Sequence, residues 1–292
     1  MSDIIDKIEK SRNNESYYRE LGREMKEIKD RAALFFDIDG TLWNYDHYIP
    51  ESTFQAVRAA RKNGHYALIC SGRSRSFVDD PELLSIGFDG LVCACGCHIE
   101  IGGRVVSEYL IDEDRARETI EMVRNYGLKP ILEGPEFSYM DEVDFPVGDL
   151  FGDILRRDMG KKLLPIGGEQ YGKWRINKFS TEATDTEAAE LCYRKLEKDF
   201  QVIRHDERVS EVVPAGFDKA GGMLKACELL GIDPQNTYAF GDSENDLLML
   251  KAAGHGIAMG NGTERAKQAA DYVTSPFDAD GIFLAMEHYG LI

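Results

Sequence analysis

The sequence predicts an α/β protein whose parallel β-sheet is interrupted by an inserted α+β domain. Short, almost entirely apolar stretches such as "AALFF" (32–36) and "HYALIC" (65–70) alternate with helical stretches, a composition typical of buried parallel strands. The same alternation returns near the C-terminus, in "TYAFGD" (237–242) and "GHGIAMGNG" (254–262). Residues 112–208 lie between the two halves and show a different pattern, which indicates a separate domain.

The first elements follow from helical periodicity and capping residues. Residues 1–30 are highly charged and carry isoleucines at helical spacing, which predicts a helical N-terminal extension, packed on the body or serving as a partner-binding arm. The stretch "STFQAVRAARKNG" (52–64) predicts a helix with Ser52 as its N-cap and Gly64 as its stop.

The inserted segment begins and ends with a long helix. "DEDRARETIEMVRNYG" (112–127) is the first, "TDTEAAELCYRKLEKDF" (184–200) is the second, and short mixed strands such as "KWRINKFS" (173–180) lie between them. The predicted organisation is therefore a core made of residues 31–111 and 209–292, with residues 112–208 inserted into it.

Composition limits the range of partners. The chain has 292 residues and a formal net charge of −17, so it should repel nucleic acids and anionic membranes. No apolar run suits a signal peptide or a membrane span, and the six cysteines fit a reducing compartment. We expect a cytoplasmic protein; the sequence does not indicate its oligomeric state.

The cluster "LVCACGCHIE" (91–100) raises the question of a zinc site. Three cysteines in one strand would share a face, but Cys93 and Cys97 would then lie roughly 13 Å apart, too far for one ion unless the chain bends at Gly96. The favoured interpretation is a buried strand that uses cysteine as a small apolar residue, with His98 beside it.

Polar residues with metal-binding or catalytic potential follow three apolar strands. Ligand sites in open α/β sheets lie at the carboxyl ends of the strands, so these residues should converge. Carboxylates brought together there would form a site for a hard cation such as Mg²⁺. The residues are Asp37 and Asp39 in "FFDIDGT", Ser71, Gly72 and Arg73 in "LICSGR", and Asp242, Glu244, Asn245 and Asp246 in "GDSENDLL".

These motifs resemble those of a known family. In order and context, "DIDGTLWN", "LICSGR", the isolated Lys219 and "GDSENDLLML" are similar to the four motifs of the haloacid dehalogenase (HAD) superfamily. "GIAMGNG" (256–262) and "ADYVTSPFDADGI" (270–282) resemble its Cof-type phosphatase branch. The resemblance implies a Rossmann-like core, a cap domain inserted between the second and third motifs, and a Mg²⁺-dependent phosphatase acting on a small phosphorylated metabolite such as a sugar phosphate.

The resemblance also implies catalytic and metal-binding roles. Asp37 would be the nucleophile that forms an aspartyl-phosphate, and Asp39 would be the general acid and then the general base. The Asp37 and Asp242 side chains and the Asp39 carbonyl would hold Mg²⁺, with Asp246 supporting them from behind.

Phosphate binding would fall to a second group of residues. By the same resemblance, Ser71, Gly72, Lys219 and Asn245 would hold the phosphoryl oxygens. A carboxylate attacking a phosphate needs cations nearby, and Mg²⁺ and Lys219 would supply them. Arg73 is left open between a structural role and a contact with the substrate.

Some features depart from the family pattern or stay undecided. Cys95 stands where Cof-type chains usually carry an asparagine, which puts local loop contacts in doubt.

Trp174, Arg175 and Lys178 are candidate substrate contacts in the inserted segment. A phosphomutase of the same superfamily and a non-catalytic regulatory protein are the alternatives, although the presence of all three key aspartates counts against the second.

Overall fold

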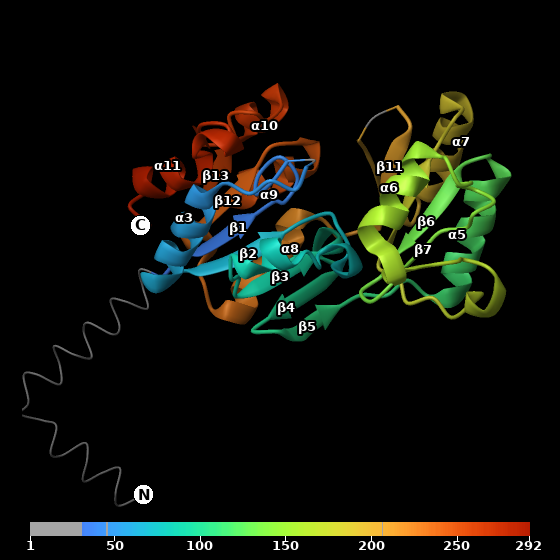
Figure 1. Ribbon diagram of the computed structural model, residues 1–292, viewed down its shortest axis with the longest axis horizontal. Helices are drawn as coiled ribbons and strands as arrows, with labels where there is room; N and C mark the ends of the chain where they lie inside the picture. The colour runs from blue at the N-terminus through green and yellow to red at the C-terminus, as the bar shows by residue number, and fades with distance from the viewer. Residues whose placement is uncertain (1–30, 45, 206) are drawn as a thin grey trace, which may run out of the picture.

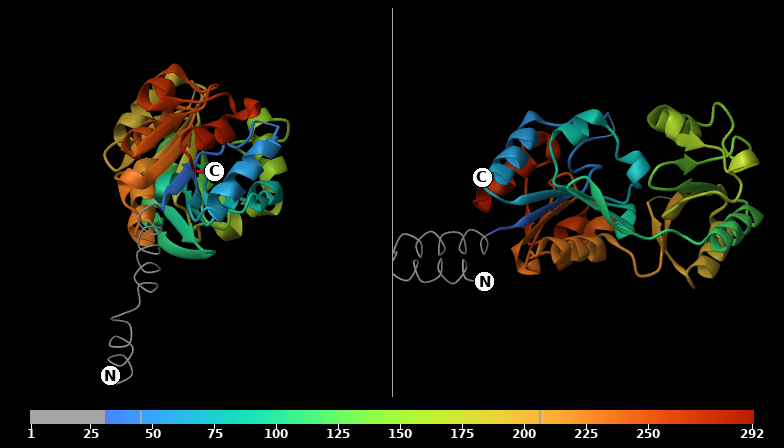
Figure 2. Two further views of the ribbon diagram at one scale, coloured as in Figure 1. Left: turned by 90° about the vertical axis from the view of Figure 1, so that its left-hand side faces the viewer. Right: turned by 90° about the horizontal axis from the view of Figure 1, so that it is seen from below.

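The computed structural model describes residues 31–292, except for residues 45 and 206. The helical extension predicted for residues 1–30 lies outside this range. Two lobes stand side by side in Figure 1 and in the right-hand view of Figure 2. The core lobe holds an eight-stranded sheet and the cap lobe holds a six-stranded sheet. No helix in the described part of the chain is long and apolar enough to cross a membrane.

The N-terminal strand lies in the interior of the core sheet. The strand order is β14-β13-β12-β1-β2-β3-β4-β5, parallel from β14 to β3 and antiparallel in the last two pairings. All four residues of β1 are buried, and they alternate between the two faces of the sheet. The strands are β1 (Ala33–Phe36), β2 (Tyr66–Cys70), β3 (Gly90–Cys93), β4 (His98–Ile101), β5 (Arg104–Glu108), β12 (Thr237–Gly241), β13 (His255–Ala258) and β14 (Tyr272–Val273).

Helices cover both faces of this sheet, as the apolar strands require. Residues of α3 and α11 join one buried cluster, and residues of α8, α9 and α10 join another on the opposite face. The sequence therefore predicted the layer arrangement of the core correctly. The core helices are α3 (Glu51–Lys62), α4 (Pro81–Ser85), α8 (Lys219–Leu230), α9 (Leu247–Ala252), α10 (Glu264–Ala269) and α11 (Gly281–His288).

The ends of α3 show one correct and one wrong prediction. Gly64 follows the C-cap residue Asn63 with φ +95°, a conformation that favours glycine, so the predicted stop is confirmed. Ser52, however, is not the N-cap. Extended Pro50 takes that position, and the Ser52 hydroxyl, inside the first turn, has no hydrogen-bond partner among the described residues.

The cap lobe packs two helices on one face of its sheet. The strand order is β10-β11-β9-β6-β7-β8, and residues of α5 and α7 form the buried cluster on the outer face. The opposite face looks toward the core lobe. The elements are β6 (Lys129–Glu133), β7 (Ser138–Tyr139), β8 (Leu163–Leu164), β9 (Lys178–Glu182), β10 (Phe200–Arg204), β11 (Val209–Pro214), α5 (Glu113–Asn125), α6 (Leu150–Met159) and α7 (Thr186–Leu196).

The return of the chain to the core lies later than predicted. Residues from 209 onward were assigned to the core, but β11 pairs with β9 and β10 in the cap sheet. We place the second crossing between the lobes after Pro214, in the short loop before α8. An apolar strand of this composition fits either sheet, and pairing with β9 determines which one it joins.

The cysteine cluster forms a turn and not a continuous strand. β3 ends at Cys93, a 3₁₀ turn covers Ala94–Gly96, and β4 then runs back antiparallel. Cys95 has φ 53°, a left-handed conformation that asparagine or glycine adopts more easily. All the cysteines are buried, but Cys93 packs in the core lobe while Cys95 and Cys97 pack against Val213 of the cap lobe. The predicted continuous strand with a shared cysteine face is therefore wrong, while the predicted burial of the cysteines is confirmed.

Candidate active site

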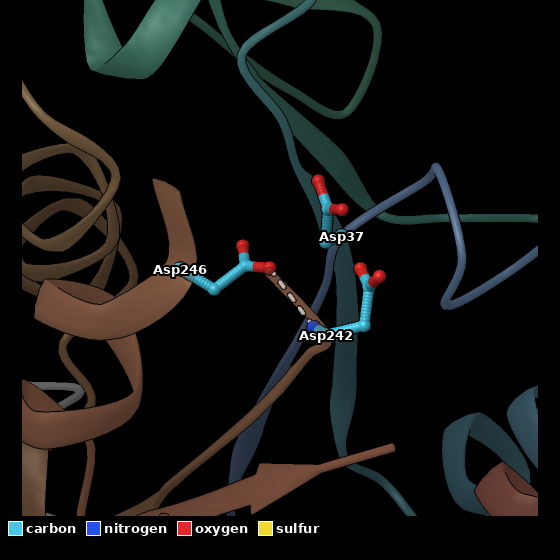
Figure 3. Close-up of side chains that lie close together, drawn as sticks. All are labelled: Asp37, Asp242 and Asp246. Carbon is cyan, nitrogen blue, oxygen red and sulfur yellow. Dashed lines mark hydrogen bonds between the residues drawn. The ribbon is translucent and has the colours of Figure 1, made fainter. Parts of the chain in front are cut away.

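The predicted residues meet at the carboxyl ends of three neighbouring strands. Asp37 directly follows β1, Ser71 follows β2 and Asp242 follows β12. Because β12, β1 and β2 are adjacent in the sheet, these positions lie at one edge. Figure 3 shows the carboxylates of Asp37, Asp242 and Asp246 facing a common space.

A tight turn after β1 brings Asp242 close to the backbone. Gly40 has φ +79°, and its N–H donates to the Trp43 carbonyl at 2.8 Å. A Cβ atom on Gly40 would lie 2.4 Å from Asp242 Oδ2. Conformation and space therefore both require glycine at this position.

Three carboxylates form a candidate cation site. One oxygen each from Asp37, Asp242 and Asp246 lies within 4.8 Å of the others. Asp246 also supports the local backbone, because its Oδ2 accepts the N–H group of Asp242 at 3.0 Å (Figure 3). The same oxygen accepts the N–H group of Ser243 at 3.1 Å. Carboxylate oxygens are the ligands that Mg²⁺ takes in proteins, so the donor set fits this ion.

Lys219 lies behind this cluster and is almost fully buried. Its Nζ lies 2.6 Å from Asp37 Oδ1 and 2.6 Å from Asp246 Oδ1, and donates to Asn245 Oδ1 at 3.2 Å. Lys219 begins α8, and the N-cap residue Asp218 accepts the N–H of Gly221. The helix start thus fixes the backbone from which the lysine reaches the site.

The charges of this group shift each other's proton affinity. Burial raises the pKa of Asp37 well above its ordinary value, and the charge of Asp246 adds to this while Lys219 opposes it. Burial, aided by Asp246, also raises the pKa of Asp242 to about 7. Burial alone would lower the pKa of Lys219, but Asp246 and Asp37 outweigh it and hold that pKa well above its usual range. A cation bound here would relieve the crowding of carboxylates.

Asp39 is held by a different cation from the one that holds Asp37. Arg73 forms a bidentate pair with it, Nε to Oδ2 at 2.7 Å and Nη2 to Oδ1 at 2.7 Å, and Trp43 Nε1 donates to Oδ1 at 3.0 Å. Burial would raise the pKa of Asp39, but the charge and hydrogen bonds of Arg73 lower it below its ordinary value. The structure thus gives Arg73 a partner inside the site.

A cavity of about 860 Å³ lies above these residues, between the lobes. Asp37, Asp39 and Asp242 line it from the core together with Ser71, Gly72 and Asn245. Of the site residues predicted in the core lobe, Lys219 and Asp246 are absent from the lining, because both are buried behind it.

The cap side of the cavity differs from what the sequence suggested. Of the three candidates there, only Lys178 lines the cavity. Trp174 packs in the cap core and donates to the Ile166 carbonyl, and exposed Arg175 pairs with Glu108 and Glu136 outside it.

Sequence reasoning missed most of the cap residues that line the cavity, among them two glutamates, a serine and a histidine. A signal was present, since a glutamate in an otherwise apolar stretch, as in "KPILE" (129–133) and "SEVV" (210–213), indicates a polar function on that face. These four residues are Glu133, Ser180, His205 and Glu211.

The fold and the site define a class of protein: a capped α/β protein with a cluster of carboxylates that could hold a cation at the ends of its sheet strands. A family model described as haloacid dehalogenase-like hydrolase matches residues 34–286. The chain belongs to this family, as the resemblance in the sequence predicted.

Known relatives place it among the phosphatases of the superfamily. The Bacillus subtilis protein named "Putative phosphatase YkrA" is 31% identical over 90% of this chain and 99% of its own length. The 5-amino-6-(5-phospho-D-ribitylamino)uracil phosphatase YitU of Bacillus subtilis is 27% identical over 88% of this chain and 96% of its own. The solved structure of the HAD subclass IIB sugar phosphatase BT4131 has a TM-score of 0.77 at 29% identity, covering 89% of this chain and 100% of that one. The chain is a HAD-type phosphatase.

Proposed function

We propose that the protein is a Mg²⁺-dependent phosphatase that hydrolyses a small phosphorylated metabolite, of the sugar phosphate kind, through an aspartyl-phosphate on Asp37. The observation that carries the proposal is the placement of Asp37: its carboxylate lines the cavity, pairs with Lys219 and lies within the cluster formed with Asp242 and Asp246. The sugar phosphatase and ribitylaminouracil phosphatase relatives support the substrate class.

The charge balance of the cavity supports a metal cofactor. The two cations near the predicted phosphate site are engaged, Lys219 by Asp37 and Asp246, and Arg73 by Asp39. A phosphate entering beside these carboxylates therefore needs further positive charge. Mg²⁺ held by Asp37, Asp242 and the Asp39 carbonyl, with Asp246 behind them, would neutralise the phosphate and polarise it toward attack.

The residues of the chain would then divide the reaction into two halves. In the first, an Asp37 oxygen attacks phosphorus, the bond to the leaving oxygen breaks, and Asp39 gives that oxygen a proton. Ser71, Asn245 and the Gly72 backbone hold the phosphoryl oxygens while Lys219 stabilises their charge. In the second half, Asp39 takes a proton from water as the water attacks phosphorus, which releases inorganic phosphate and restores Asp37.

The two carboxylates next to the reacting phosphorus would thus have separate duties. Arg73 and Trp43 donate hydrogen bonds to the Asp39 carboxylate, and the Arg73 contact keeps that carboxylate ionised. Transfer to the leaving group requires Asp39 to exchange part of its contact with Arg73 for the substrate oxygen. Arg73 is accordingly a positioning residue in this scheme.

Release of inorganic phosphate tests the proposal. The purified protein should hydrolyse p-nitrophenyl phosphate and sugar phosphates with Mg²⁺ and lose this activity with excess EDTA, and Mg²⁺ should restore it. Full activity in EDTA would refute the metal requirement. Isomerised sugar phosphate without free phosphate would show a mutase, and an intact substrate in every condition would show a non-catalytic protein.

A further inference from the structure

A mixed ionic cluster lies on the cap face that looks into the cavity. In the sheet register, Glu133 of β6 pairs directly with Lys178 of β9, and Glu211 of β11 pairs with Ser180 of β9. Their strand neighbours Leu132, Phe179 and Val212 pack in the cap core against the helices. Because strand side chains alternate, the four polar residues share the opposite face, and all four line the cavity.

The cluster is tightly connected and largely withdrawn from solvent. Lys178 Nζ lies 3.0 Å from Glu133 Oε1 and 3.1 Å from Glu211 Oε2. Ser180 Oγ donates to Glu133 Oε1 at 2.5 Å, and His205 Nε2 lies 2.8 Å from Glu211 Oε1. Burial would raise the pKa of Glu211, but Lys178 and His205 hold it well below its usual range, so this carboxylate keeps its charge.

One acceptor of the cluster remains available. Glu133 is only 5% exposed, and its Oε2 takes no hydrogen bond from any residue that the structure describes. Because Glu133 lines the cavity, a substrate hydroxyl or amino group placed there can donate a hydrogen bond to this oxygen. The Glu133 carboxylate would repel an anionic group in the same place.

The lysines and arginines of the cavity already have carboxylate partners, with which a second anion would have to compete. Each lysine and arginine that lines the cavity is paired with a carboxylate, and seven carboxyl side chains line it against four lysine and arginine side chains. Buried Lys178 is shared between two glutamates. Glu211 also lies beside the predicted phosphate site, since a Cβ on Gly72 would be 3.0 Å from its Oε1.

We propose that the cluster of Glu133, Lys178, Ser180 and Glu211 is a leaving-group subsite that selects phosphate esters of uncharged polyhydroxy or amino compounds and disfavours those with a second anionic group. This inference rests on the proposed function, because it assumes that the phosphate occupies the core side of the cavity. Glu133 Oε2 and Glu211 accept hydrogen bonds from the leaving group in this assignment.

A matched substrate pair tests the subsite. Sorbitol 6-phosphate and 6-phosphogluconate differ only in an alcohol against a carboxylate at the far carbon. The wild type should prefer the alcohol in kcat/KM by at least about tenfold, since like-charge contacts cost several kcal/mol. Glu133→Gln keeps the shape but removes the charge, so it should reduce this ratio at least about threefold. The ratio of the two kcat/KM values does not depend on the fraction of enzyme molecules that is active. Urea unfolding would check that the variant is folded.

The control variant is Glu187→Gln, an exposed glutamate of α7, which should leave the ratio unchanged. A wild type that hydrolyses both esters equally, or prefers the carboxylate, would overturn the inference, as would an unchanged ratio in Glu133→Gln. Hydrolysis of p-nitrophenyl phosphate with neither ester accepted would overturn the subsite and leave the proposed function standing. Failure to hydrolyse any phosphate ester would remove both.

Discussion

Replacing Lys219 with methionine should destabilise the metal-free protein more strongly as the pH rises. The side chain is 1% exposed and holds two carboxylates that are 5% and 0% exposed, each at 2.6 Å. Removing one partner of a buried pair costs about 3–5 kcal/mol when the charges left behind stay ionised. At low pH Asp37, whose pKa burial raises, escapes part of this cost by taking up a proton.

The raised carboxyl pKa determines whether the loss of stability grows or shrinks as the pH rises. A carboxyl group whose pKa is raised by folding binds more protons in the folded than in the unfolded protein, so stability falls as pH rises toward the folded pKa. For each such proton the slope is about 1.4 kcal/mol per pH unit. Lys219 opposes the rise in the pKa of Asp37 and of Asp242, so both pKa values should rise further without it. The loss in the free energy of unfolding should therefore be larger at pH 8 than at pH 6.

Urea unfolding in EDTA at these two pH values measures the effect. The matched control is Lys225→Met on the same helix, whose side chain is 45% exposed and pairs with Glu228 one turn away. Such a surface pair contributes about 0.5 kcal/mol or less. A Lys219→Met variant that loses no more stability than Lys225→Met, or whose loss is the same at both pH values, would refute the reasoning.

Further predictions concern the chemistry of the site and its contact with the cap. Asp37→Asn should abolish phosphate release yet stabilise the metal-free protein, because burial raises the pKa of Asp37; near-normal turnover would disprove its role as nucleophile. Asp39→Asn should slow turnover by about 100-fold or more while still trapping labelled phosphoenzyme, and normal turnover would exclude acid–base catalysis by this residue. Mg²⁺ affinity measured by calorimetry should fall as pH drops below the Asp242 pKa of about 7, by about tenfold for a full pH unit if one proton must leave; a flat profile would contradict this. Gly72→Ala should raise KM, because the added Cβ would lie 3.0 Å from Glu211 Oε1 and press on the cap; an unchanged KM would show that the two lobes can separate freely there.

Sequence reasoning succeeded where neighbours in the chain determine the result. Asp37 and Asp242 were placed correctly because each directly follows an apolar strand, and the ends of neighbouring parallel strands meet at one edge. Lys219 was expected near them because the motif resemblance pointed to it, although it lies 182 residues from Asp37. Placing Asp37 and Asp242 requires only the local sequence patterns and the order of the strands in the sheet.

The cap side required information that the chain order does not carry. Glu133, Lys178 and Glu211 come together through the register of β6, β9 and β11, and a shift of one residue would turn each side chain to the helix-covered face. The pairing of Asp39 with Arg73 likewise depends on the turn after β1. The left-handed turn at Cys95 was missed because cysteine, unlike glycine or asparagine, does not favour this backbone conformation.

The central position of β1 has a consequence for synthesis of the chain. Its partner on one side, β2, follows soon after it, but its partner on the other side, β12, comes only after the whole cap lobe has been made. At about 5–20 residues per second, translation leaves this gap of roughly 200 residues open for about 10–40 seconds. During that interval the apolar strand "ALFF" has one unpaired edge, which is a template for aggregation and a binding site for chaperones. Asp37, the proposed nucleophile, thus directly follows the strand whose second edge is paired only late in synthesis.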